Sequence, residues 1–131
     1  MLLDACAIFS AVEQGKLSFV TAQATSPLAE YELGNALWKK AVLGRVISVQ
    51  ESLDAMALFH DVLHQMKKVR AEAKAALGSA ASAEVSFYDA SYLQAAIVMD
   101  IPLVTDDTKF FRKAGKFVRV LTLAQALASN K

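Results

Sequence analysis

Short apolar runs alternate with longer helical segments along this chain, and this alternation restricts the possible folds more than any other feature. Met1 to Leu3, Ile101 to Thr105 and Phe117 to Leu121 are apolar runs of strand length. Between them lie stretches in which apolar residues recur every three or four positions, as in amphipathic helices. Short buried strands that alternate with helices are typical of an α/β fold with a mainly parallel sheet. We therefore expect a central sheet of four or five strands with helices on both faces.

Helix-start signals place most of the helices. Ser48-Val49-Gln50-Glu51 and Ser86-Phe87-Tyr88-Asp89 have the spacing of a capping box. Ser26-Pro27 suits an N-cap followed by the first helical position. Leu17 to Val20 is a candidate strand, and Gly78-Ser79 predicts a break or loose packing in a basic, alanine-rich segment. The expected helices are Ala5 to Glu13, Ser26 to about Leu43, Ser48 through Leu63, Phe87 to Met99, Lys109 to Lys113 and a last one after Thr122.

The bulk composition fits one packed domain that spans residues 1–131. Hydrophobic residues make up 55% of the chain and charged residues 21%, which supplies a core and argues against disorder. Lys and Arg total 14 and Asp and Glu total 13, so the formal charge is only +1. Any binding of nucleic acid must therefore come from local basic clusters rather than from an overall positive field.

Cysteine content and hydropathy indicate the compartment. The single cysteine, Cys6, rules out a disulfide within the chain and a cysteine-rich zinc site, and it suits a reducing cytoplasm. No apolar run reaches the ~18–20 residues of a membrane span. Asp4 interrupts the apolar start, which also lacks a basic segment, so we expect no signal peptide.

Four acidic residues occupy positions that suggest a shared site: Asp4, Glu32, Asp89 and Asp107. Asp4 ends the first strand and Asp107 follows the Ile101–Thr105 strand, and open parallel sheets bind ligands beyond the carboxyl ends of their strands. Asp89 and Glu32 have apolar neighbours at helical spacing, so both are expected to face inward. Converging carboxylates repel one another unless a cation lies between them. Oxygen-only ligands suit Mg²⁺ or Mn²⁺.

Each of these acids also has a purely structural interpretation. Asp89 could be only the reciprocal partner of Ser86 in a capping box, and Glu30 competes with Glu32 for the inward position. Asp106 and Asp107 could be ordinary turn residues. His60 and His64 have the i, i+4 spacing that zinc sites use, but the pattern is not His-Glu-x-x-His and no third ligand is evident, so a structural pair is favoured.

Four segments, taken in order, resemble the motifs of PIN-domain ribonucleases of the VapC toxin type. Leu2 to Ala7 resembles the first strand and acid of that family, and Tyr31 to Trp38 resembles its helix with Glu followed by Asn. Phe87 to Leu93 resembles its third acidic motif, and Leu103 to Asp107 its Thr-any-Asp motif. Together the segments cover nearly the whole chain. The resemblance implies a compact α/β/α sandwich, metal-dependent hydrolysis of RNA and pairing with a small VapB-like antitoxin.

The resemblance also implies roles for particular residues. Asp4, Glu32, Asp89 and Asp107 would be the catalytic carboxylates, and Asp4, Asp89 and Asp107 would hold Mg²⁺ or Mn²⁺. The bound metal would lower the pKa of a water and stabilise charge on the phosphate. Cys6 stands where the family often has Ser or Thr. Supporting polar roles are implied for Asn35, Thr105 and Asp106.

Two further features bear on partners. Lys109, Arg112 and Lys113 follow Asp107 closely, so they are candidates for contacts with RNA phosphates. The helices predicted over 28–43 and 53–63 are more apolar than one small core needs, and exposed apolar faces often mark partner surfaces. A homodimer and an antitoxin groove would both use them.

Rival functions remain open at this level. A PIN-fold binding module without catalysis and an RNA-processing nuclease that is not a toxin share the same expected fold. A phosphatase of the haloacid dehalogenase type would need Asp-x-Asp at the start, and position 6 is Cys. A receiver-type domain would need paired acids after its first strand, which Asp4 lacks.

Overall fold

The computed structural model describes residues 1–130 and contains one sheet of five parallel strands. This confirms the predicted α/β class. The order across the sheet is β3-β2-β1-β4-β5, so the first strand lies in the centre. Its Leu2 pairs with Ala24 on one side and with Leu103 on the other. The strands are β1 (Leu2–Leu3), β2 (Ala24–Thr25), β3 (Lys67–Lys68), β4 (Leu103–Val104) and β5 (Val120–Leu121).

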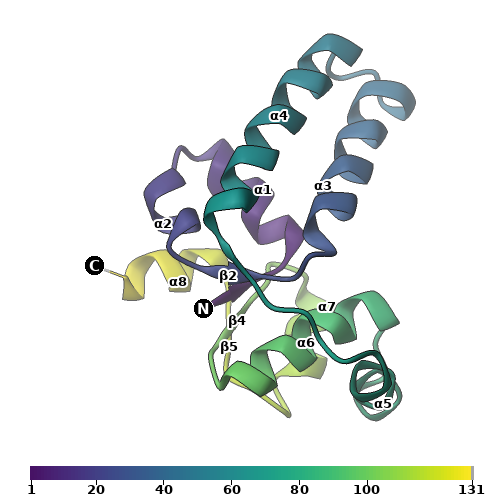
Figure 1. The fold of residues 1–131 in the computed structure, drawn as a ribbon, viewed down its shortest axis with the longest axis vertical. Helices are drawn as coiled ribbons and strands as arrows, with labels where there is room; N and C mark the ends of the chain where they lie inside the picture. The colour runs from purple at the N-terminus through teal and green to yellow at the C-terminus, as the bar shows by residue number, and fades with distance from the viewer. Residues whose placement is uncertain (131) are drawn as a thin grey trace.

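Helices cover the sheet on two sides (Figure 1). The first four helices lie on one side, and α5, α6 and α7 lie on the other. None of the helices within residues 1–130 is both long enough and apolar enough to span a membrane. They are α1 (Ala5–Glu13), α2 (Leu17–Thr21), α3 (Ala29–Trp38) with the π-helical turn η1 (Lys39–Leu43), α4 (Val49–Gln65), α5 (Ala73–Ala83), α6 (Phe87–Met99), α7 (Thr108–Ala114) and α8 (Leu123–Ser129).

The two central strands form the heart of the core. The side chains of Leu2, Leu3, Leu103 and Val104 are fully buried, as their apolar sequence predicts. Removing such side chains from water is the dominant favourable term in folding. Because both strands are fully buried in the core, the residues that follow them at the carboxyl edge of the sheet are held in fixed positions.

Several predicted boundaries prove wrong. Leu17 to Val20 is part of the helix α2 rather than a strand: Phe19 and Val20 are its buried residues, and Thr21 Oγ1 donates to the Leu17 carbonyl within the turn. Gly78 and Ser79 lie inside the continuous helix α5. A Cβ at Gly78 would meet nothing within 4 Å, so the glycine faces open space and only lowers helix propensity.

The helix predicted from Ser26 starts later and ends differently. Ser26 Oγ accepts from the Leu28 amide, but α3 begins at Ala29, which places Glu32 in its first turn rather than in mid-helix. Beyond Trp38 the chain widens into η1, whose Lys39 carbonyl accepts from the Gly44 amide at 2.8 Å. The predicted capping box of Ser48 and Glu51 is confirmed and starts α4, which packs back along α3. The far ends of α3 and α4 project as a hairpin (Figure 1).

Candidate metal-dependent active site

The site lies where the strand order reverses. After β1, the chain places β2 and β3 on one side of it and then β4 and β5 on the other side. The strand order therefore reverses between β1 and β4. Ligand sites in open α/β sheets lie at such points, beyond the carboxyl ends of the strands. A pocket of about 690 Å³ opens here, and its walls include Asp4 directly after β1 and Asp107 shortly after β4.

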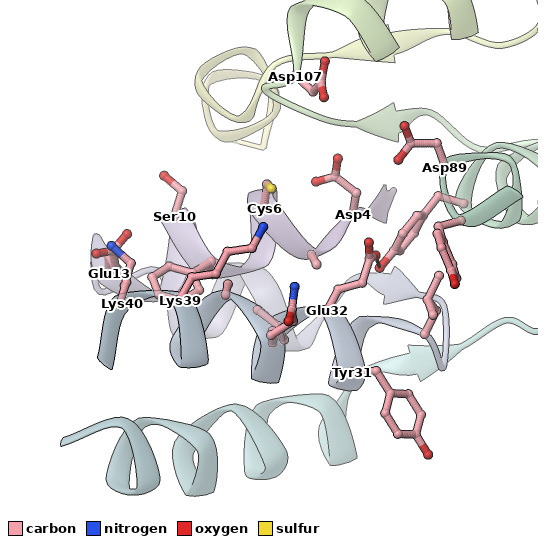
Figure 2. A pocket seen from close by; sticks show the side chains of 18 residues that line it. Asp4, Cys6, Ser10, Glu13, Tyr31, Glu32, Lys39, Lys40, Asp89 and Asp107 are labelled. Carbon is pink, nitrogen blue, oxygen red and sulfur yellow. Dashed lines mark hydrogen bonds between the residues drawn. The ribbon is translucent and has the colours of Figure 1, made fainter. Parts of the chain in front are cut away.

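All four predicted carboxylates line this one pocket, although they come from four separate elements. Asp4 precedes α1, Glu32 belongs to α3, Asp89 to α6, and Asp107 precedes α7. Figure 2 shows their carboxyl groups facing a common space. Nothing in the packing of the core requires four acids to meet, so their convergence indicates a site for a positively charged ligand.

Asp4 is the most buried of the four and is held from two directions. Its Oδ1 accepts from the Ala7 amide at 2.9 Å and so caps α1, and its carboxyl also hydrogen-bonds with the Thr105 side chain. Only 6% of Asp4 is exposed. Burial raises the pKa of Asp4 to about 6, against the lowering effect of these hydrogen bonds, and the charges of Asp89 and Glu32 add to the rise.

Asp89 is only half of the predicted capping box. Ser86 Oγ accepts from the Asp89 amide at 3.0 Å and caps α6, but the Asp89 carboxylate does not accept a hydrogen bond from the Ser86 amide. It faces the pocket instead (Figure 2). Burial raises the pKa of Asp89 to about 6, with further contributions from the charges of Glu32 and Asp107. The purely capping interpretation of Asp89 is therefore wrong.

Contacts between helices decide between the two candidate glutamates. Glu30 pairs with His60 of α4 at 3.1 Å on the outer surface, which also accounts for that histidine. Glu32 turns into the pocket and accepts a 2.5 Å hydrogen bond from the hydroxyl of Tyr92. Tyr92 is 1% exposed, and burial together with Glu32 raises its pKa, so its hydroxyl stays a donor. The sequence did not predict this contact. Its one indirect signal is that Tyr92, three residues after Asp89, lies on the same face of the helix.

The two adjacent aspartates differ in their surroundings. Asp107 caps α7: its Oδ1 accepts from the amides of Lys109 and Phe110, each at 3.0 Å, and it lines the pocket. Asp106 lies outside the pocket and accepts from the Leu123 amide at 2.9 Å, at the start of α8. The buried Thr105 accepts from the Asp107 amide at 3.1 Å and so joins Asp4 to the turn.

The remaining predicted residues are divided between two hollows. Asn35 and Cys6 line the main pocket, and burial followed by the nearby acids raises the pKa of the Cys6 thiol. A second hollow of about 210 Å³ shares Asp89 and Asp107 with the first. Its walls include Lys109 and Lys113, and Lys113 Nζ also donates to the Glu84 carbonyl at 2.6 Å. Arg112 is exposed and lines neither hollow.

The donor set fits a hard divalent cation. Its four carboxylates supply oxygen alone, the ligand type of Mg²⁺ and Mn²⁺, and their mutual repulsion and burial are relieved when a cation is bound. Within residues 1–130, no three His, Cys, Asp or Glu side chains lie close enough together to hold one ion.

Comparison with known proteins identifies the family of the chain. The sequence model of the PIN domain matches residues 1–116. The protein named Exonuclease VapC9 from Pyrobaculum aerophilum is 34% identical over 111 residues, which cover 79% of this chain and 75% of that protein. The crystal structure of PAE2754 from Pyrobaculum aerophilum superposes with a TM-score of 0.82 at 29% identity, over 98% of this chain and 93% of that one. The chain therefore belongs to the PIN domain family.

Proposed function

We propose that the chain, acting as one domain, is a metal-dependent endoribonuclease that hydrolyses RNA phosphodiester bonds in the cytoplasm, as the toxin of a VapBC-type pair. The convergence of four carboxylates from four elements in one pocket carries this proposal. Membership of the PIN domain family supports nuclease chemistry, and the relative named as an exonuclease bears the VapC name.

In this proposal the residues divide the work. Asp4, Asp89 and Asp107 would hold Mg²⁺ or Mn²⁺, which when bound would lower the pKa of a water and offset charge on the phosphate. Glu32 would accept a hydrogen bond from the attacking water, and the Tyr92 hydroxyl, which donates to Glu32, holds its carboxylate in place. Thr105 plays the same part for Asp4.

Two outer polar residues complete the proposed assignment. Asn35 offers an amide to the RNA one turn beyond Glu32 on the pocket wall of α3. Asp106 supports the site from outside, because its bond to α8 fixes the turn that presents Asp107.

The shape of the site favours cutting within a strand. Because the two hollows share Asp89 and Asp107, together they offer a path for a strand past these carboxylates. An RNA strand that runs through it extends beyond the cleaved bond on both sides, with Lys109 and Lys113 beside the shorter arm. We assign phosphate contacts to these two lysines and a weaker, more distant one to Arg112.

A circular RNA tests the mode of cleavage directly. We expect the purified protein with Mg²⁺ or Mn²⁺ to cut a covalently closed single-stranded RNA, because a strand held in both hollows needs no free end. The measurement is conversion of circles to linear products on a denaturing gel, with the linear form of the same RNA as control. Degradation of the linear RNA alone would show an exonuclease, and stability of both RNAs would contradict the nuclease proposal.

The hairpin of α3 and α4 offers the proposed partner surface for a homodimer and for the antitoxin. Its projecting end exposes a run of large apolar side chains that the core does not use. Val46 at 70% and Leu43 at 64% are the most exposed of them, and such patches mark protein interfaces. We name this set the hairpin-tip patch: Trp38, Val42, Leu43, Val46, Val49 and Leu53.

Charge placed in the hairpin-tip patch should disrupt self-association. For Val46→Glu/Val49→Glu we expect an unchanged circular dichroism spectrum, because both side chains are exposed, and a shift from dimer to monomer in analytical ultracentrifugation. Val98→Glu, at an equally exposed apolar position on α6, serves as the control. A wild-type protein that is monomeric at high concentration would contradict the homodimer.

A further inference from the structure

The main pocket is a groove with a second end that the carboxylates do not occupy. One face of α3 and η1 forms its wall, carrying Glu32, then Asn35 and Ala36, then Lys39 and Lys40. These positions recur every three to four residues, as residues on one helix face do. At 1.5 Å of rise per residue, Lys39 lies about 10 Å further along the helix than Glu32. The opposite wall is α1, from Asp4 to Glu13.

The far end of this groove has the opposite charge to the near end. Figure 2 shows Lys39 and Lys40 arising from the side of the pocket away from Asp89, with the Lys39 amino group reaching toward Cys6. Two lysines and Glu13 give this end a formal charge of +1, whereas the four acids give the other end −4. The only ion pair within 4.0 Å among residues 1–130 joins Glu30 to His60, so no carboxylate lies that close to either lysine.

A contact across the groove positions Lys40, and the local helix geometry places Lys39 on the same side. Lys40 Nζ lies 5.5 Å from the centre of the Phe9 ring, a cation–π contact across the groove, and Phe9 packs on Phe59 at 5.1 Å between ring centres. The wider π-helical turn of η1 takes more residues per turn than an α-helix, so consecutive residues diverge less around the axis. Both lysines therefore remain on the groove side.

We propose that Lys39 and Lys40 form a phosphate-binding subsite that holds a backbone phosphate of single-stranded RNA away from the cleaved bond. This inference rests on the proposed ribonuclease function and names where its substrate is gripped. A stacked strand advances about 3.4 Å per nucleotide, so about 10 Å corresponds to roughly three nucleotides and to fewer in an extended strand. The largely apolar wall between the two ends, with Phe9 and Ala36, suits the intervening nucleosides.

The test compares Lys39→Gln/Lys40→Gln with a control that loses the same charge elsewhere, Lys74→Gln/Lys116→Gln, whose lysines line neither hollow. Cleavage is measured on a ladder of single-stranded oligoribonucleotides from a dinucleotide upward. We expect KM for the longer substrates to rise about tenfold at unchanged kcat, as for loss of charge-assisted contacts. Dinucleotide cleavage should be unaffected, because a dinucleotide does not reach the subsite. A variant that is merely misfolded would cleave the longer substrates and the dinucleotide more slowly alike.

Salt dependence gives a second measurement of the same contact. The slope of log binding constant against log salt should fall by about 0.7 for each phosphate contact removed. Fluorescence anisotropy of the oligonucleotides without divalent metal measures this independently of catalysis. The single variants Lys39→Gln and Lys40→Gln repeat the test should the double variant fold poorly.

The outcomes separate this inference from the proposed function. If wild-type protein cleaves RNA but the double variant keeps the wild-type length dependence and salt slope, the subsite is wrong and the nuclease stands. If the variant loses affinity only for an acidic protein partner, the subsite is equally wrong. If no RNA is cleaved but anisotropy still shows the lysine-dependent slope, the nuclease proposal fails, while binding of an RNA phosphate by the two lysines is supported.

Discussion

Asp4→Asn is expected to lower Mg²⁺- or Mn²⁺-dependent RNA cleavage by about a thousandfold or more, because it removes several kcal/mol of charge stabilisation through the metal. The substitution keeps the size of the side chain and an acceptor for the Ala7 amide, so α1 should remain capped. The measurement is the single-turnover cleavage rate of a labelled RNA at saturating metal, with the fold checked by circular dichroism.

The matched control lies in one helix. Glu32→Gln should impair cleavage because Glu32 lines the pocket, whereas Glu30→Gln should not, since Glu30 faces outward and pairs with His60. A preparation of Asp4→Asn that cleaves at the wild-type rate after removal of contaminating nucleases would refute the assignment of the active site.

The metal-free protein should lose stability as the pH rises from about 4 to above 6. The pKa of Asp4 in the folded chain is about 6, above its ordinary value of 3.8, so folding favours the protonated carboxyl. This stabilising contribution is complete below 3.8 and lost as the pH rises through 6. At about 1.4 kcal/mol per pKa unit, the loss is about 3 kcal/mol. Asp89, whose pKa is raised to the same value but which is less buried, adds a smaller loss in the same range.

Urea unfolding in EDTA at a series of pH values measures this loss. Asp4→Asn should match wild type near pH 4 and exceed it in unfolding free energy near pH 7.5, because the amide has no charge to bury. Added Mg²⁺ should restore the unfolding free energy of the wild-type protein at the higher pH and change that of the variant little, since ligand binding stabilises only the state that binds it. Equal pH profiles for the two proteins would show that the surroundings of Asp4 do not raise the pKa of its carboxyl.

The central part of the fold was predictable because local and tertiary signals agree there. The apolar runs around Leu2 and Leu103 are fully buried strands, and the capping box at Ser48 starts a helix as expected. The edge of the sheet was not predictable. Lys67 and Lys68 of β3 are both exposed and carry no apolar signal, so only backbone pairing with β2 makes them a strand. Ala24–Thr25 is equally short.

The four acids could be found from their motifs, but the contacts that support them could not. The choice of Glu32 over Glu30 depends on Tyr92 and His60, which lie 60 and 30 residues away in the sequence. The different surroundings of Asp106 and Asp107 depend on where α8 begins. The placement of Lys39 and Lys40 on the groove depends on the π-helical turn of η1, which the sequence does not predict. In the sequence, the two lysines look like an ordinary solvated pair.

The central position of β1 has a consequence for folding. β1 pairs with β4, which lies about a hundred residues later in the sequence, and Asp106 accepts a hydrogen bond from the Leu123 amide. Contacts so distant in sequence form late, because a long loop must close first. A folding intermediate in which β4 has not yet paired with β1 therefore holds Asp4 without the turn that carries Asp107. The carboxylates thus come together only late in folding, when the two halves of the sheet join.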